Sequence, residues 1–193
     1  MSKDKFQNKY RIASARAQWW DYGWNGAYYI TICTQNREHF LGEIANAKFI
    51  ATPIGNLAQQ IWYEIPNQFP YCDLGDFVVM PNHIHGILVL DKPTVTNASA
   101  NVVETRLIAP LQHKKQGGIT GAKNPMLNDN ISRIVRWYKG RCSFEIRKFH
   151  ADFAWQPRFH DHIIRDDAEY QRISDYIINN PENWDNDKFN SGK

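Results

Sequence analysis

The chain has 193 residues, of which 42% are hydrophobic and 13% aromatic, and its formal net charge at pH 7 is +3. This composition excludes a disordered chain and predicts one domain with one core, and so small a charge permits nucleic-acid binding without requiring it. The three cysteines lack Cys-x-x-Cys spacing and no apolar run approaches the ~20 residues that span a bilayer, so we expect a soluble, cytoplasmic protein without membrane contact.

Residues 1–26 form a polar arm in which lysines and arginines are interleaved with aromatic residues. Such an arm suits a nucleic-acid backbone and its bases, but an arm packed on its own domain has the same composition, and both interpretations stay open. Residues 27–34, AYYITICT, are β-branched and aromatic and predict a strand. We expect residues 49–52 to pair with it as a hairpin.

A helix and two strands are predicted next. Leu57, Ile61 and Ile65 have helical spacing, which predicts a helix over residues 57–62 with Asn56 as its N-cap and Pro66 as its stop. Residues 77–80 and 83–90 are apolar runs that predict strands. A turn is expected between them, because the proline at position 81 cannot donate to a central ladder.

His83 and His85 stand in the second of these apolar runs. Residues two apart on a strand project from the same face about 6.6 Å apart, so both imidazoles can converge on one ion or phosphate. Imidazole is the commonest metal-binding side chain, but buried histidines also occur in ordinary cores, and His-x-His opens zinc hydrolase and cupin sites as well. Spacing alone does not decide, so a third ligand and a reacting group must come from elsewhere.

Residues 92–128 lose hydrophobic periodicity and predict a loop-rich surface excursion. Lys114, Lys115 and Lys123 make a basic loop over a site one interpretation, and a solvated insertion is the other. Asp129 or Asn130 then caps a predicted helix that runs to about Lys139 and that Gly140 ends. The polar face of this helix is basic, which suits a phosphate backbone or simple solvation.

The last predicted helix begins after Asp166, which forms a capping box with Glu169, and runs to about residue 179. It is preceded by residues 153–165, FAWQPRFHDHIIR, whose density of aromatic and charged side chains is unusual for a connector; they either pack structurally or line the site. Tyr176 and Asn180 stand four apart and share one helix face at its accessible end. On spacing alone, Tyr176 is either a packed aromatic or a nucleophile.

Four motifs follow one another in the chain: MPNHIHGI, WYKGR, WQPRFHDHIIR and YIINNPENW. In this order they resemble the REP-associated tyrosine transposases, relatives of insertion-sequence transposases within the HUH single-strand endonucleases. The resemblance implies an α+β fold, with a ferredoxin-like antiparallel sheet and helices packed on one face. Residues 27–187 would form the catalytic domain, flanked by the arm at 1–26 and a polar tail at 188–193.

The resemblance also implies roles for single residues. His83 and His85 match the HUH metal pair, Tyr176 matches the nucleophilic tyrosine, and Asn180 falls where the family places a third metal ligand, commonly glutamine in insertion-sequence relatives. The implied cofactor is Mg²⁺ or Mn²⁺. Seven residues are candidates for DNA contacts: Arg133, Arg136, Lys139, Arg141, Trp155, Arg158 and Arg165.

The implied activity is nicking and rejoining of single-stranded DNA at a hairpin through a 5′-phosphotyrosine, by a monomer or a homodimer. The alternative is a DNA-hairpin-binding protein of the same fold that has lost the chemistry.

Overall fold

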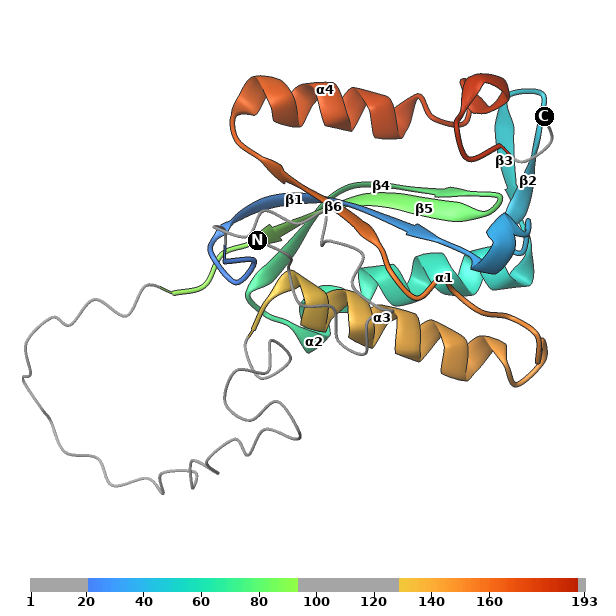
Figure 1. The fold of residues 1–193 in the computed structure, drawn as a ribbon, viewed down its shortest axis with the longest axis horizontal. Helices are drawn as coiled ribbons and strands as arrows, with labels where there is room; N and C mark the ends of the chain where they lie inside the picture. The colour runs from blue at the N-terminus through green and yellow to red at the C-terminus, as the bar shows by residue number, and fades with distance from the viewer. Residues whose placement is uncertain (1–20, 94–128, 191–193) are drawn as a thin grey trace, which may run out of the picture.

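Four antiparallel strands form the main sheet, in the order β4-β5-β1-β6 (Figure 1). Their bounds are Gly26–Cys33 for β1, Cys72–Met80 for β4, His83–Leu90 for β5 and His160–Ile164 for β6. This is a computed structural model that describes residues 21–93 and 129–190. The predicted α+β class, the antiparallel sheet and the inner position of the His-x-His strand are confirmed.

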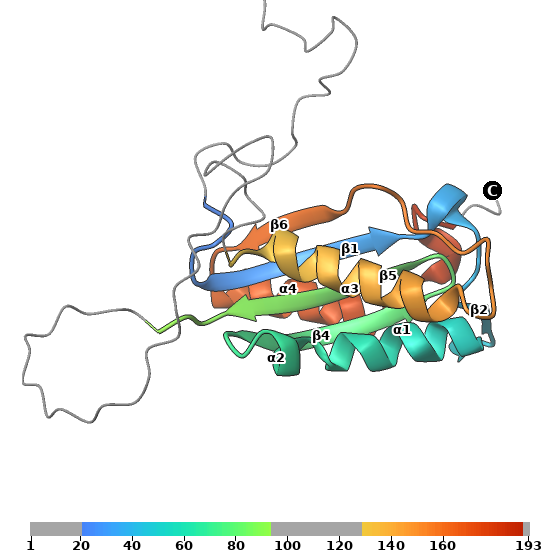
Figure 2. The same ribbon diagram turned by 90° about the horizontal axis from the view of Figure 1, so that it is seen from below.

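Helices lie over the sheet in two layers. The layer expected on one face consists of α1 (Pro53–Tyr63), α2 (Ile65–Gln68) and α3 (Ile131–Ile146). On the opposite face lies α4 (Asp167–Ile178) (Figure 1). Figure 2, seen from below, shows α1 and α3 in front of the strands and α4 behind them.

The alternation of side chains along β1 and β5 divides the core into two clusters. Tyr28, Ile30 and Ile32 of β1 belong to the larger cluster, which includes the buried residues of α1 and α3. The smaller cluster consists of Ile87, Ile164, Ile173 and Ile177, and so joins the sheet to α4. His83 and His85 have the same parity as Ile87, and therefore face α4.

The predicted pairing of residues 49–52 with the first strand was wrong. β3 (Lys48–Ala51) pairs with β2 (Gly42–Ala45) in a separate two-stranded sheet. Both edges of β1 are already occupied, one by β5 and the other by β6. The sequence pattern did not predict β6, because its residues HDHII are mostly half-buried on an edge strand and lack a regular apolar alternation.

The ends of the helices confirm some of the caps and stops predicted from the sequence and contradict others. Asp166 accepts a hydrogen bond from the backbone nitrogen of Glu169 at 2.8 Å, which confirms it as the N-cap of α4. Asn56 was the wrong cap for α1, because Thr52 accepts from Gly55 N at 3.1 Å and Pro53 occupies the first turn, where no donor is needed. Pro66 ends no helix but lies in the first turn of α2.

The predicted end of α3 at Gly140 was also wrong. Asn130 caps α3 as expected, accepting from Arg133 N at 3.0 Å, but the helix continues to Ile146. A glycine inside a helix costs only about 0.5–1 kcal/mol relative to alanine. Burial of Tyr138, Cys142 and Ile146 on both sides of Gly140 outweighs that cost.

Gly86 is the residue of β5 that packs against Trp62 of α1. A Cβ at this position would overlap the ring of Trp62, which is fully buried and stacks on Phe77 at a centroid distance of 4.5 Å. The indole therefore excludes any side chain from the position that follows His85.

Residues 1–20, most of the predicted arm, and residues 94–128, which include all three lysines of the predicted excursion, lie outside the described residues. None of the helices in the described ranges is long and apolar enough to cross a membrane.

We expect Gly86→Ala to lower the free energy of unfolding by about 1–3 kcal/mol, because the methyl group must displace Trp62 or β5. The control is Gly140→Ala, where nothing lies within 4 Å of the added Cβ; this change should raise the free energy of unfolding by about 0.5–1 kcal/mol. Urea denaturation measures both. Equal effects of the two substitutions would contradict the claim that the indole fills the space beneath position 86.

Candidate metal and tyrosine site

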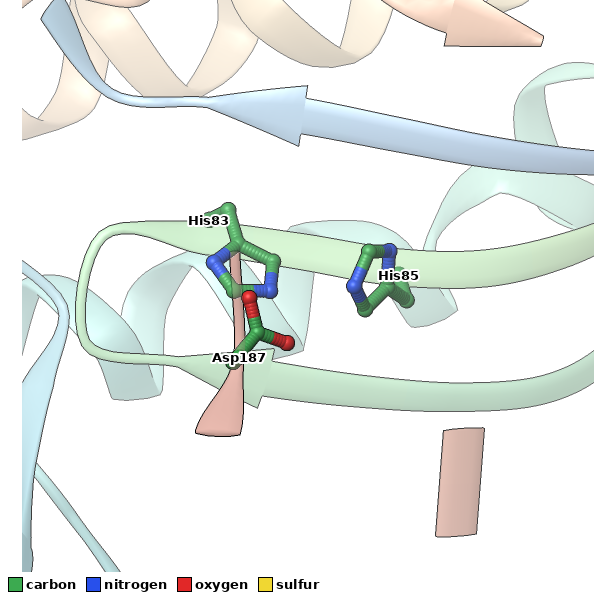
Figure 3. Close-up of side chains that lie close together, drawn as sticks. All are labelled: His83, His85 and Asp187. Atoms are coloured by element: carbon green, nitrogen blue, oxygen red, sulfur yellow. The ribbon is translucent and has the colours of Figure 1, made fainter. Parts of the chain in front are cut away.

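His83, His85 and Asp187 form a cluster whose ligand atoms all lie within 4.8 Å of one another. The histidine rings come from β5, with centroids 4.5 Å apart, and Asp187 comes from the chain that follows α4 (Figure 3). The two imidazoles are 0% and 1% exposed. The predicted pair therefore converges in one place, together with a carboxylate that the sequence pattern did not indicate.

Asn82 sets the proton position on His83. Its side-chain nitrogen donates to the carbonyl oxygens of Arg37 at 3.2 Å and Phe189 at 2.8 Å, so its oxygen is the atom that faces His83 Nδ1, at 2.8 Å. Because an amide oxygen only accepts, Nδ1 carries the hydrogen and Nε2 keeps its lone pair. That Nε2 is buried and has no hydrogen-bond partner among the described residues.

His85 is held by two hydroxyl groups of β1. Thr31 stands directly opposite His85 in the antiparallel register, and its Oγ1 lies 2.9 Å from His85 Nδ1. The Tyr29 hydroxyl lies 2.7 Å from the same nitrogen. Hydrogen bonds of this kind to the outer nitrogen orient metal-binding imidazoles in proteins.

Burial keeps both imidazoles neutral. It lowers the pKa of His83 to about 3, with the nearby charges of Arg37 and Lys188 acting in the same direction. Burial likewise lowers the pKa of His85 well below its usual value, and His83 adds to this shift. Neutral imidazole is the form that binds a cation.

Tyr176 presents its hydroxyl to the same cluster from α4. Its oxygen lies 3.4 Å from His85 Nε2 and 3.5 Å from Asp187 Oδ2, and the side chain is 43% exposed. Asn180 and Tyr29 both make hydrogen-bond contacts with this hydroxyl. Burial and the Asp187 carboxylate raise the pKa of Tyr176, and those two hydrogen bonds oppose the shift. The predicted nucleophile therefore lies within contact of a predicted metal ligand.

Asn180 is one turn beyond Tyr176, at the end of α4, and is 2% exposed. Its Oδ1 has no hydrogen-bond partner within the described ranges. Two unpartnered buried acceptors, His83 Nε2 and Asn180 Oδ1, together with the Asp187 carboxylate, make a donor set that fits a divalent cation.

The segment after α4 covers the histidines. The Phe189 ring lies 4.6 Å from the His83 ring, and that of Trp184 lies 6.0 Å from it. Arg37 donates to the Lys188 carbonyl at 3.2 Å, and Phe189 N donates to Asp187 Oδ1 at 2.6 Å. These contacts hold Asp187 with its second oxygen toward Tyr176.

A cavity of about 640 Å³ opens beside Tyr176. Its lining combines cationic side chains with amides and histidines: Tyr29, His160, His162, Arg172, Ile173, Tyr176, Asn180, Asn183, Asn186, Asp187 and Lys188. The Nε2 atom of His162 lies 2.8 Å from Glu169 Oε1, within hydrogen-bond distance. Residues 160 and 162, from the dense stretch of the sequence, therefore line the site.

The arginines of α3 lie elsewhere. Arg133, Arg136 and Arg141 line a separate surface cavity of about 580 Å³. They belong to α3, which lies on the side of the sheet opposite α4 (Figure 2). Arg133 pairs with Asp129, and Arg141 pairs with Glu145 at 2.8 Å. These acidic partners offset part of the basic charge that the sequence pattern emphasised.

The remaining candidates for DNA contacts are spread over the molecule. Lys139 donates to the backbone carbonyl of Gln156, and Trp155 is 7% exposed and packs in the larger core cluster. Arg158 and Arg165 are exposed. None of these four lines the cavity beside Tyr176.

Protonation of the two histidines should make the metal-free protein less stable in acid. In the unfolded chain they bind protons near pH 6.5, whereas folded His83 does so only near pH 3. Between these values the unfolded state holds more protons, so stability falls as the pH is lowered, by at most about 1.4 kcal/mol per pH unit for each histidine.

We expect the double variant His83→Gln, His85→Gln to lose this part of the pH dependence. Urea denaturation from pH 7 to pH 4 in the presence of a chelator measures it, with the wild-type protein as reference. The same slope in both proteins would contradict the burial of neutral imidazoles.

No protein-family profile matches the chain. An uncharacterised protein of Haemophilus influenzae is 34% identical over 177 residues, which are 91% of this chain and 91% of that protein. Among solved structures, a REP-associated tyrosine transposase bound to a REP hairpin matches with a TM-score of 0.54 and 20% identity, over 86% of this chain and 73% of that one. The chain therefore belongs to one family with the Haemophilus influenzae protein, and it has the fold of a REP-associated tyrosine transposase.

Proposed function

We propose that the protein is a metal-dependent DNA-nicking and strand-transferring transposase that acts on single-stranded DNA carrying a hairpin. The observation that carries this proposal is the 3.4 Å approach of the Tyr176 hydroxyl to His85 Nε2, within a cluster suited to a cation. The likeness in fold to a transposase solved with a REP hairpin supports the choice of substrate.

The cation would be held by His83, His85 and Asp187, with Asn180 Oδ1 as a further ligand. Carboxylate and amide oxygens favour Mg²⁺ or Mn²⁺, whereas imidazoles also bind Zn²⁺. When bound, such a cation supplies charge that polarises the non-bridging oxygens of a phosphate.

The reaction of Tyr176 is a transesterification. Its oxygen forms a bond to phosphorus, the bond from phosphorus to the 3′ oxygen breaks, and the phenol proton is balanced by the proton that the 3′-OH gains. We propose that Asp187 Oδ2, which lies 3.5 Å from the Tyr176 hydroxyl, receives the phenol proton. The product is a 5′-phosphotyrosine, and a 3′-OH from another strand can reverse the step without ATP.

The cavity beside Tyr176 suits an anionic strand. Arg172 and Lys188 supply positive charge, and Asn183 and Asn186 supply amide groups that can hydrogen-bond to base edges. Of the arginines proposed from the sequence, those of α3 are on the opposite side of the sheet, so we propose that they contact DNA away from the cleaved bond.

Tyr176→Phe should abolish a covalent protein–DNA adduct, because the variant lacks the attacking oxygen. A labelled hairpin oligonucleotide incubated with wild-type protein and Mn²⁺ should give an SDS-resistant band, which EDTA removes. Tyr63→Phe is the matched control, since Tyr63 is exposed on α1, across the sheet from the site. An adduct in Tyr176→Phe would refute the assignment; hairpin binding by the wild type without any adduct would favour the binding protein without chemistry.

Asn82→Ala should weaken Mn²⁺ binding about 10- to 100-fold, because His83 loses the acceptor that orients it. Asn82→Asp keeps an oxygen acceptor and should bind more tightly than the alanine variant. Asn56→Ala, an exposed change on α1, is the control. Isothermal titration with Mn²⁺ measures the affinities, and equal binding by Asn82→Ala and the wild type would exclude this role for Asn82.

A further inference from the structure

Tyr29 contacts both halves of the site. Its ring stacks on His85, with centroids 5.4 Å apart and planes at 29°, and meets the Tyr176 ring edge-on at 6.4 Å. Its hydroxyl lies 2.7 Å from His85 Nδ1 and also hydrogen-bonds to Tyr176 and Thr31. Ring packing alone needs no hydroxyl at this position, so the hydroxyl calls for a separate explanation.

The number of hydrogens at His85 limits how this network is arranged. A neutral imidazole carries one hydrogen, while its Nδ1 faces the hydroxyls of Tyr29 at 2.7 Å and Thr31 at 2.9 Å. When the hydrogen is on Nε2, both hydroxyls can donate to Nδ1. When the hydrogen is on Nδ1, this nitrogen becomes the donor, and the hydroxyl hydrogens must turn to other acceptors.

If His85 were to hold a cation through Nε2, the nitrogen that faces Tyr176, it would need the lone pair of that nitrogen, and Nδ1 would then carry the hydrogen, as in the second arrangement. The Thr31 hydrogen can then turn to the Tyr29 oxygen, which is in hydrogen-bond contact with it. The Tyr29 hydrogen can turn to the Tyr176 oxygen, its other hydroxyl contact. The imidazole keeps one hydrogen throughout, and only the nitrogen that carries it changes.

We infer that Tyr29 is a positioning residue through which cation binding at His85 directs a hydrogen-bond donor to the Tyr176 oxygen. The inference rests on the proposed function, since it links the proposed metal site to the proposed nucleophile. In the loaded site the Tyr176 oxygen is held by Tyr29 and Asn180 together, whereas in the alternative tautomer Tyr29 donates to His85.

The linkage is tested by Mn²⁺ affinity in the absence of DNA, read from the electron paramagnetic resonance signal of free Mn²⁺. The proteins are the wild type, Tyr29→Phe, Tyr176→Phe and the double variant. Tyr176→Phe removes the acceptor for the Tyr29 hydrogen in the loaded site. We therefore expect it to weaken Mn²⁺ binding roughly 3- to 30-fold in the wild-type background and to have no further effect once Tyr29 is phenylalanine.

Thr31→Val is the matched background, because Thr31 bonds to the same His85 nitrogen but the described contacts of Tyr176 do not include it. There the effect of Tyr176→Phe on Mn²⁺ affinity should persist. A purely structural role for Tyr29 predicts the same loss from Tyr176→Phe in all three backgrounds, and that result would overturn the inference. Urea unfolding of each variant establishes that the folded proteins are compared.

A second measurement uses the complete reaction. With Mn²⁺ at saturation, Tyr29→Phe should form the hairpin adduct roughly 10- to 100-fold more slowly, because the Tyr176 oxygen has lost one donor. An unchanged rate would count against the inference.

The two proposals fail in different ways. A wild-type protein that forms the adduct but shows independent effects of Tyr29 and Tyr176 on Mn²⁺ affinity overturns the inference alone. A wild-type protein that shows the coupling in Mn²⁺ affinity but never forms the adduct overturns the proposed function alone.

Discussion

The antiparallel pairing of β5 with β1 is the constraint on which the site depends. It places Thr31 opposite His85, and parity then brings Tyr29 and both histidines to the side of the sheet that α4 covers. A shift of one residue would turn the imidazoles into the larger core and present Ile84 and Gly86 to α4. The apolar residues of β1 and β5 that pack on α1 and α3 oppose such a shift, so the main core fixes the position of the two histidines.

Burial of two imidazoles is costly unless each finds hydrogen-bond partners. Asn82 hydrogen-bonds to Nδ1 of His83, and the hydroxyls of Tyr29 and Thr31 hydrogen-bond to Nδ1 of His85. In both rings Nδ1 is the nitrogen that faces away from the cluster. Among the described residues, His83 Nε2 has no hydrogen-bond partner, and His85 Nε2 has the Tyr176 hydroxyl at 3.4 Å. The arrangement keeps the rings neutral and oriented, but it leaves His83 Nε2 and Asn180 Oδ1 without hydrogen-bond partners in the part of the chain that the structure describes.

Local rules predicted the parts of the site that lie within single elements. Alternation placed His83 and His85 on one face of a strand, and the Asp166 cap with helical spacing placed Tyr176 and Asn180 on one end of α4. The position of Asp187 depends on how the segment after α4 folds back over β5, and the spacing of hydrophobic residues does not predict that path. Nor do local rules reveal that α3 continues through Gly140 or that β3 pairs outside the main sheet, since packing decides both.

Gly86 sets how far His85 stands from the opposite layer of the protein. The side chains of His85 and Ile87, the two neighbours of Gly86, point toward α4. On the other side of the strand, the edge of the Trp62 indole occupies the volume that a side chain at position 86 would fill. Altered volume at position 62 would therefore be transmitted through the backbone of β5 to His85, although the indole never faces the cavity. Residues 62 and 86 share one packing volume, so added bulk at position 86 must displace the indole or the strand.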